Sequence, residues 1–142
     1  MKLELKHLAG YLPYGLNCYG QGEIVEGAEY DEKPIPKLLT ITGLDANLVT
    51  VEGIRITVDE SIMIEDCFPI LRPLSDLTKV IEVNVEKFVP STLGLNLPLD
   101  NLISEEILKL KYTTVQKLLE WHFDIFGLIE NGLAIDINTL EL

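Results

Sequence analysis

The sequence predicts an α+β fold, in which a small antiparallel β-sheet or barrel follows a short N-terminal helix and precedes a C-terminal helical pair. β-Branched runs separated by close turns predict the sheet. No long helical segment lies between these runs, which argues against a parallel α/β arrangement. The length of 142 residues suits one domain, residues 1–142, with residues 16–89 mainly β and residues 102–130 mainly α.

The first half of the chain contains the predicted helix and most of the strands. Leu3–Leu12 has apolar residues at helical spacing, and Pro13 and Gly15 are expected to end that helix. Leu16–Tyr19 is a candidate first strand. Lys37–Ile64 is rich in Val, Ile and Thr and predicts three antiparallel strands in a meander.

Residues 78–90 allow two interpretations. Apolar Ile81, Val83 and Val85 alternate with polar residues, which is typical of one half-buried strand. Phe88 breaks this alternation, so a hairpin is the alternative.

Two helices are expected in the last third. Leu102–Leu110 predicts a short helix that is capped by Ser104. Thr113–Glu130 is the longest helix-periodic segment and is apolar around most of its circumference. Asn131-Gly132 can supply the left-handed residue that ends this helix. Leu133–Ile137 is expected to form a short strand after it.

The second helix predicts an association surface. Its polar stripe is narrow, and Trp121 and Leu128 flank it on the helical wheel. A helix of this kind is enclosed by its own domain or shared with a second subunit. Trp121, Leu128 and Ile125 are therefore candidate interface residues, most simply in a two-fold homodimer.

His122 lies near the centre of the apolar arc of the same predicted helix. It could be a ligand or a general base with Glu120 or Asp124 as partner. Residues two apart point away from each other on a helix, so neither acid can pair with it directly. The sequence therefore favours a buried, structural histidine.

Composition restricts the function. The hydrophobic fraction is 47% and the net charge is −12, which indicates an ordered, soluble and acidic protein. Such a charge argues against binding to a nucleic-acid backbone or to an anionic membrane surface. Apolar excess and acidity together predict a protein partner. Cytoplasmic location is expected, since there is neither a membrane-length apolar run nor a signal-peptide core.

No cofactor, metal or catalytic group is predicted. Cys18 and Cys67 lack the spacing of a zinc site and are expected to be reduced thiols. The acidic residues of Glu23–Pro36 lack the ligand pattern of an EF-hand, so they are interpreted as a solvated loop, with cation binding as the alternative.

Several stretches resemble a known group of proteins. These stretches are Tyr11–Leu16, Pro69–Thr78, Glu86–Pro90 and Val115–Leu140, and the resemblance extends over about half of the chain. They resemble a family of small, uncharacterised proteins in phages and prophages of Bacteroidota bacteria. The resemblance implies phage origin and action in the host bacterial cytoplasm, and it supplies no catalytic residues.

One departure from this family concerns residues 78–90. The family tends to have Asn-Gly where this chain has Asn84-Val85. Asn-Gly would make a tight hairpin between Thr78–Val83 and Glu86–Val89. Valine is poorly suited to such a turn, yet the similarity on both sides favours the hairpin over one strand.

The expected function is that of a small, soluble, phage-encoded accessory protein that binds a host or phage protein without catalysis. The alternatives are a hydrolase, a protein that binds a small nucleotide through an acidic or histidine site, and a minor virion or assembly component. The candidate groups for the enzymatic alternatives are Glu65, Asp66, Asp59 and His122, with Arg72 and Lys79 for an anionic substrate.

Overall fold

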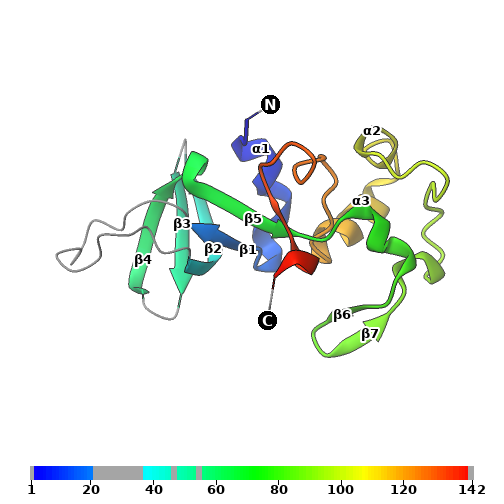
Figure 1. Ribbon diagram of the computed structural model, residues 1–142, viewed down its shortest axis with the longest axis horizontal. Coiled ribbons are helices and arrows are strands. Elements are labelled where there is room, and N and C mark those ends of the chain that lie inside the picture. Colours follow the sequence, from blue (N-terminus) through cyan, green and yellow to red (C-terminus); the bar gives the residue numbers. More distant parts are fainter. Residues whose placement is uncertain (1, 21–36, 46–47, 54–55, 141–142) are drawn as a thin grey trace. The chain divides into compact units, whose positions relative to one another are not determined.

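The chain forms two compact units, Met1–Ile70 and Leu71–Leu142, where the sequence predicts one domain. The computed structural model describes residues 2–20, 37–45, 48–53 and 56–140 (Figure 1). Helices and strands occur as predicted for an α+β fold, with a short N-terminal helix and a C-terminal helical pair.

The N-terminal helix is short, as expected. α1 covers Leu5–Leu8 and continues as a 3-10 helix over Ala9–Tyr14. The backbone N–H of Glu4 donates to Nδ1 of His7 at 3.0 Å, which satisfies one of the amides that a helix start leaves unpaired. Gly15 ends the segment with a left-handed φ of 64°, so the predicted stop at Gly15 is confirmed, whereas Pro13 lies inside the 3-10 helix and does not end it.

An antiparallel sheet forms the rest of the N-terminal unit. Its strands are β1 (Asn17–Gly20), β2 (Lys37–Asp45), β3 (Leu48–Gly53), β4 (Ile56–Met63) and β5 (Cys67–Leu71). They are hydrogen-bonded in the order β4-β3-β2-β1-β5, and each of these pairs is antiparallel. The predicted meander over residues 37–64 is therefore confirmed as β2-β3-β4.

The core of this unit draws on the helix and the strands. Its fully buried side chains include Tyr11, Leu16 and Cys18. Tyr11 comes from the 3-10 helix, whereas Leu16 and Cys18 lie on either side of the exposed Asn17 where β1 begins, as the two-residue period of a strand requires.

The C-terminal unit is built from short elements. They are the 3-10 helix Leu74–Thr78, β6 (Ile81–Val83), β7 (Glu86–Phe88), the 3-10 helix Pro90–Thr92, α2 (Ser104–Ile107), α3 (Tyr112–Glu120), β8 (Ile135–Asp136) and the 3-10 helix Ile137–Thr139. α2 and α3 are the predicted helical pair, although both are shorter than the sequence predicts. Ile103 rather than Ser104 takes the N-cap position of α2.

Within residues 78–90, Ile81–Phe88 forms a hairpin rather than one strand (Figure 1). β6 and β7 pair with Ile81 opposite Phe88 and Val83 opposite Glu86. The two residues between them, Asn84 and Val85, have φ angles of 51° and 68°. Positive φ at both central residues is the geometry of a type I′ turn, which matches the right-handed twist of the two strands.

The predicted helix Thr113–Glu130 is wrong over its second half, because α3 ends at Glu120. His122 has a left-handed φ of 61°. Its N–H donates to the carbonyl of Leu119, and the N–H of Phe123 donates to the carbonyl of Leu118. This pair of bonds is the Schellman motif that closes many helices. Mainly turns follow up to Gly132, whose predicted left-handed conformation is confirmed at φ 70°.

One apolar cluster organises the C-terminal unit. The Trp121 ring packs against the Phe88 ring, with centroids 5.0 Å apart. This contact ties the hairpin to the end of α3. The other buried members of the cluster are Leu77, Ile81, Ile107, Leu118, Phe123 and Ile125.

Candidate functional site

Arg72 fixes the chain where it leaves α3. Its backbone N–H donates to the carbonyl of His122 at 2.8 Å, and its carbonyl accepts from the N–H of Asp124 at 2.9 Å. Its guanidinium donates to the carbonyls of Trp121 at 3.0 Å and Glu82 at 2.9 Å. Burial lowers the pKa of Arg72, and the charge of Asp76 opposes this effect. The arginine therefore holds two segments of the unit together.

Asp124 organises the turns that follow. Its side chain is buried, with 4% exposure. Oδ1 accepts the N–H of Leu128 and Oδ2 accepts the N–H of Ile129, both at 2.9 Å. A buried carboxylate needs such donors, because a charge without partners is costly in the interior. The two bonds wrap residues 125–129 around the carboxylate.

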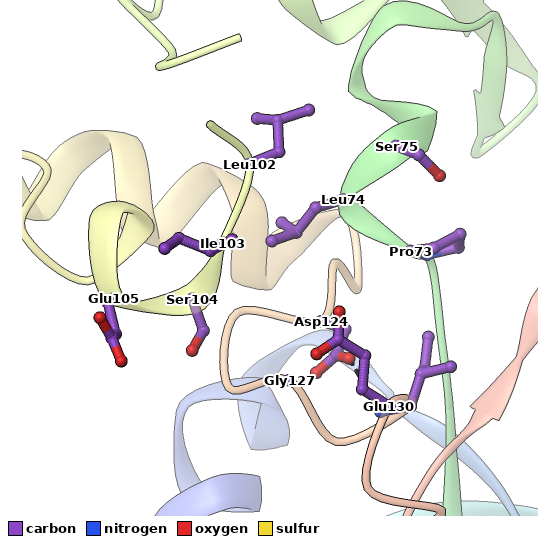
Figure 2. A pocket seen from close by; sticks show the side chains of 11 residues that line it. Pro73, Leu74, Ser75, Leu102, Ile103, Ser104, Glu105, Asp124, Gly127 and Glu130 are labelled. Carbon is purple, nitrogen blue, oxygen red and sulfur yellow. Dashed lines mark hydrogen bonds between the residues drawn. The ribbon is translucent and has the colours of Figure 1, made fainter. Parts of the chain in front are cut away.

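A groove lies beside this carboxylate, within the C-terminal unit. Its volume is about 310 Å³, near the lower end of the range of ligand pockets. Three segments line it (Figure 2), and they are Pro73–Ser75, Leu102–Glu105 and residues 124, 127, 129 and 130. Apolar side chains of Leu74, Ile103 and Ile129 alternate with polar ones in this lining. We call it the acidic groove.

The charges of the acidic groove all have one sign. Asp124, Glu105 and Glu130 line it, and no Lys, Arg or His does. Figure 2 shows Glu105 and Glu130 on opposite sides of the recess. Among the described residues, ion pairs occupy Glu106 and Glu120 on the neighbouring helices but neither Glu105 nor Glu130. The two exposed carboxylates at the rim are thus free of an intramolecular cation in the described part of the chain.

Comparisons with protein-family models, curated proteins and solved structures found no match. The functional argument therefore depends on this chain's own residues. Within residues 2–20, 37–45, 48–53 and 56–140, no cluster of three or more His, Cys, Asp or Glu side chains could hold a metal ion. No helix of that described part is both long enough and apolar enough to span a bilayer.

The structure corrects the predicted interface. Trp121, Ile125 and Leu128 are only 8%, 2% and 0% exposed within the chain itself. Trp121 and Ile125 belong to the apolar cluster of the C-terminal unit. The prediction placed them on one continuous helix with too little cover, and the turn at His122 instead folds them inward. Side chains buried to this degree offer little surface to a second copy, and a homo-oligomer stays a prediction.

The groups considered for hydrolysis are not gathered into one site within a unit. His122 is half-buried at the end of α3, not a buried residue of a helix interior as predicted. Glu65 is exposed and Asp66 is half-buried, and both lie in the 3-10 helix Ile64–Asp66 of the N-terminal unit. Lys79 pairs with Asp76 at 3.4 Å. The acidic segment 23–36 and the Asp59 side chain lie outside the described residues.

The two cysteines meet inside the N-terminal unit. Both are free thiols, and Cys18 and Cys67 are 0% and 2% exposed. β1 and β5 pair with Gly20 opposite Cys67 and Pro69 opposite Cys18, so both thiols lie on one face of the sheet. A hydrogen bond with Cys18 and burial raise the pKa of Cys67. This burial is consistent with the predicted reduced, inert thiols.

Sequence reasoning missed the acidic groove. Leu74, Ile103 and Ile129 lie far apart in the sequence, and each fits an ordinary amphipathic pattern. One local signal was available, since an acid three residues before a glycine, as in Asp124 and Gly127, is typical of a capped turn. Gly127 does have a left-handed φ of 72°.

Proposed function

We propose that this chain is a small accessory protein that acts by binding a protein partner, with the acidic groove as the docking site for a segment of that partner. The observation that carries the proposal is an open recess with apolar side chains in its wall and carboxylates at its rim. Binding sites in proteins combine an apolar lining with a few placed polar groups. The resemblance to phage and prophage proteins supports a host or phage partner met in the bacterial cytoplasm.

The state of Asp124 favours docking over catalysis in this groove. A general acid or base needs a carboxyl group that can exchange a proton with a bound molecule. Both oxygens of Asp124 instead accept backbone N–H groups at 2.9 Å. The carboxylate supports the wall of the groove, and the rim carboxylates are exposed to solvent.

Peptide-display selection against the intact chain tests this function. Ile103→Asn places a polar group in the apolar wall without changing the charge of the groove, and Leu99→Asn makes the same change outside the groove. The two side chains are 44% and 47% exposed, so neither change disturbs a buried core. Selected peptides should bind the wild type and Leu99→Asn alike, and bind Ile103→Asn about tenfold more weakly or worse.

Circular dichroism spectra that match the wild type would show that both variants fold. A selection that enriches no binder, or binders that retain full affinity for Ile103→Asn, would refute the groove as a docking site.

A further inference from the structure

We infer that the acidic groove is built for a protein segment that presents an arginine or lysine beside an apolar side chain. This inference rests on the proposed function and names the chemistry of the occupant. It begins with the rim, where Glu105 and Glu130 stand on opposite sides of the recess and face no basic residue of the lining (Figure 2). A segment that covered these carboxylates without supplying a cation would desolvate two charges. No ion pair would then offset the free-energy cost of that desolvation.

The neighbouring acid of α2, Glu106, is paired with a cation of the same chain. Glu106 pairs with Lys109, with Nζ 3.4 Å from Oε1. Glu105 precedes it directly and is one of the residues that line the groove, and no ion pair to it occurs among the described residues. The chain thus satisfies one acid of α2 internally and leaves the other for a cation from outside.

The apolar wall suits the stem of a basic side chain. Lysine and arginine bury their methylene groups along apolar surface while the charged head stays in water or on a carboxylate. Leu74 points from its 3-10 helix toward the segment that carries Ile103 (Figure 2). Together with Ile129, these side chains offer an alkyl surface next to the rim.

Arginine fits this arrangement better than lysine. Its planar guanidinium can make paired hydrogen bonds to a carboxylate, and it is more weakly hydrated than an ammonium group. The net charge of −12 also repels acidic segments at longer range and attracts basic ones.

Titration of the full chain with short peptides, followed by NMR of the backbone amides, tests the inference. The probes are Ac-Ile-Arg-Leu-NH₂ and its counterparts with Ala or Glu in place of Arg. The Arg peptide should shift the amide signals of Ser75, Ser104 and Gly127, and it should bind about fivefold or more tightly than the Ala peptide. The Glu peptide should bind most weakly.

Two double variants complete the experiment. Glu105→Gln with Glu130→Gln should abolish the advantage of Arg over Ala. Glu82→Gln with Glu86→Gln removes the same charge from the exposed strands of the hairpin and should preserve that advantage.

The outcomes separate this inference from the proposed function. If Ala and Arg peptides shift the groove signals with equal affinity, the groove binds peptide and the preference for a cation is refuted. If the preference survives in the Glu105/Glu130 variant, the rim is not its source and the inference is also refuted. If none of the peptides shifts the groove signals, both the inference and the proposed function fail.

Discussion

Val85 is the clearest case of a side chain in conflict with its backbone. It lies at the tip of the β6–β7 hairpin with φ 68° and is 90% exposed. A left-handed conformation costs an L-residue roughly 1–2 kcal/mol, and glycine avoids this cost. The exposed valine gains no burial in return within the chain.

Val85→Gly should therefore raise the free energy of unfolding of the C-terminal unit by about 1 kcal/mol. Urea titration followed by the fluorescence of Trp121 measures it, because this single tryptophan is buried in the same unit. The control is Val80→Gly, at a valine that is 65% exposed and has no positive φ. Val80→Gly should lower the free energy of unfolding slightly. If it raised that free energy as Val85→Gly is expected to, backbone strain at Val85 would not explain the result.

Asp124, unlike Val85, has a side chain that stabilises the local backbone, because its carboxylate accepts two backbone N–H groups. Asp124→Asn keeps one acceptor oxygen and replaces the other with an amide N–H₂ group. The backbone N–H that faces this group then has no acceptor. The free energy of unfolding should fall by about 1–3 kcal/mol, the cost of an unsatisfied buried donor. Trp121 fluorescence in urea again reports it, with the exposed Asp100→Asn as control. Equal stability of the two variants would show that the two 2.9 Å bonds contribute little.

At the scale of elements, β1 and β5 are joined by backbone pairing and by a hydrogen bond between the buried Cys18 and Cys67. In the folded chain both thiols should react with a thiol reagent far more slowly than in the denatured chain, which should show two reactive thiols. Rapid labelling of the folded chain, or fewer than two thiols without reductant after denaturation, would contradict this account.

The raised pKa of Cys67 has a consequence for stability. The folded state keeps its proton at pH values where the unfolded thiol, with a pKa of about 8.5, has lost it. Unfolding then releases a proton, so the free energy of unfolding should fall as the pH rises above about 8.5. Cys67→Ala should weaken that dependence in urea titrations at pH values on both sides of this point.

The elements differ in how far the sequence determines them. The meander β2-β3-β4 was predictable because β-branched runs and close turns are local signals. The helix after residue 113 was predicted too long because apolar residues over most of the helical wheel fit both a buried helix and a buried series of turns. A histidine ends α3 in a left-handed conformation, which glycine usually provides, so no sequence signal marked that end.

The acidic groove depends on information that local patterns do not contain. Its lining combines Leu74, Ile103 and Ile129, which only the tertiary structure brings together. The predicted interface is wrong for the same reason. An assumed helix placed Trp121 on an exposed face, whereas its contact with Phe88 buries it. Composition alone predicted the sign of the charge that the groove displays.

At the scale of the whole molecule, charge should govern how fast a partner arrives. The chain carries a net charge of −12, and opposite charge on a partner accelerates diffusional encounter. The association rate of a basic peptide from the display selection should fall about tenfold between ~0.05 M and ~0.5 M salt, because added ions screen this attraction. Stopped-flow fluorescence measures the rate, and a rate independent of salt would contradict a charge-guided encounter.

Docking in the acidic groove is the central claim, and hydrogen exchange measured by mass spectrometry tests it most directly. The full chain is compared with and without a saturating amount of a selected peptide. Exchange should slow in the segments 73–75, 102–105 and 124–130, which contain the residues that line the groove, and stay unchanged in the β6–β7 hairpin. Unchanged exchange in the groove segments, with slowing confined to other parts of the chain, would contradict the account.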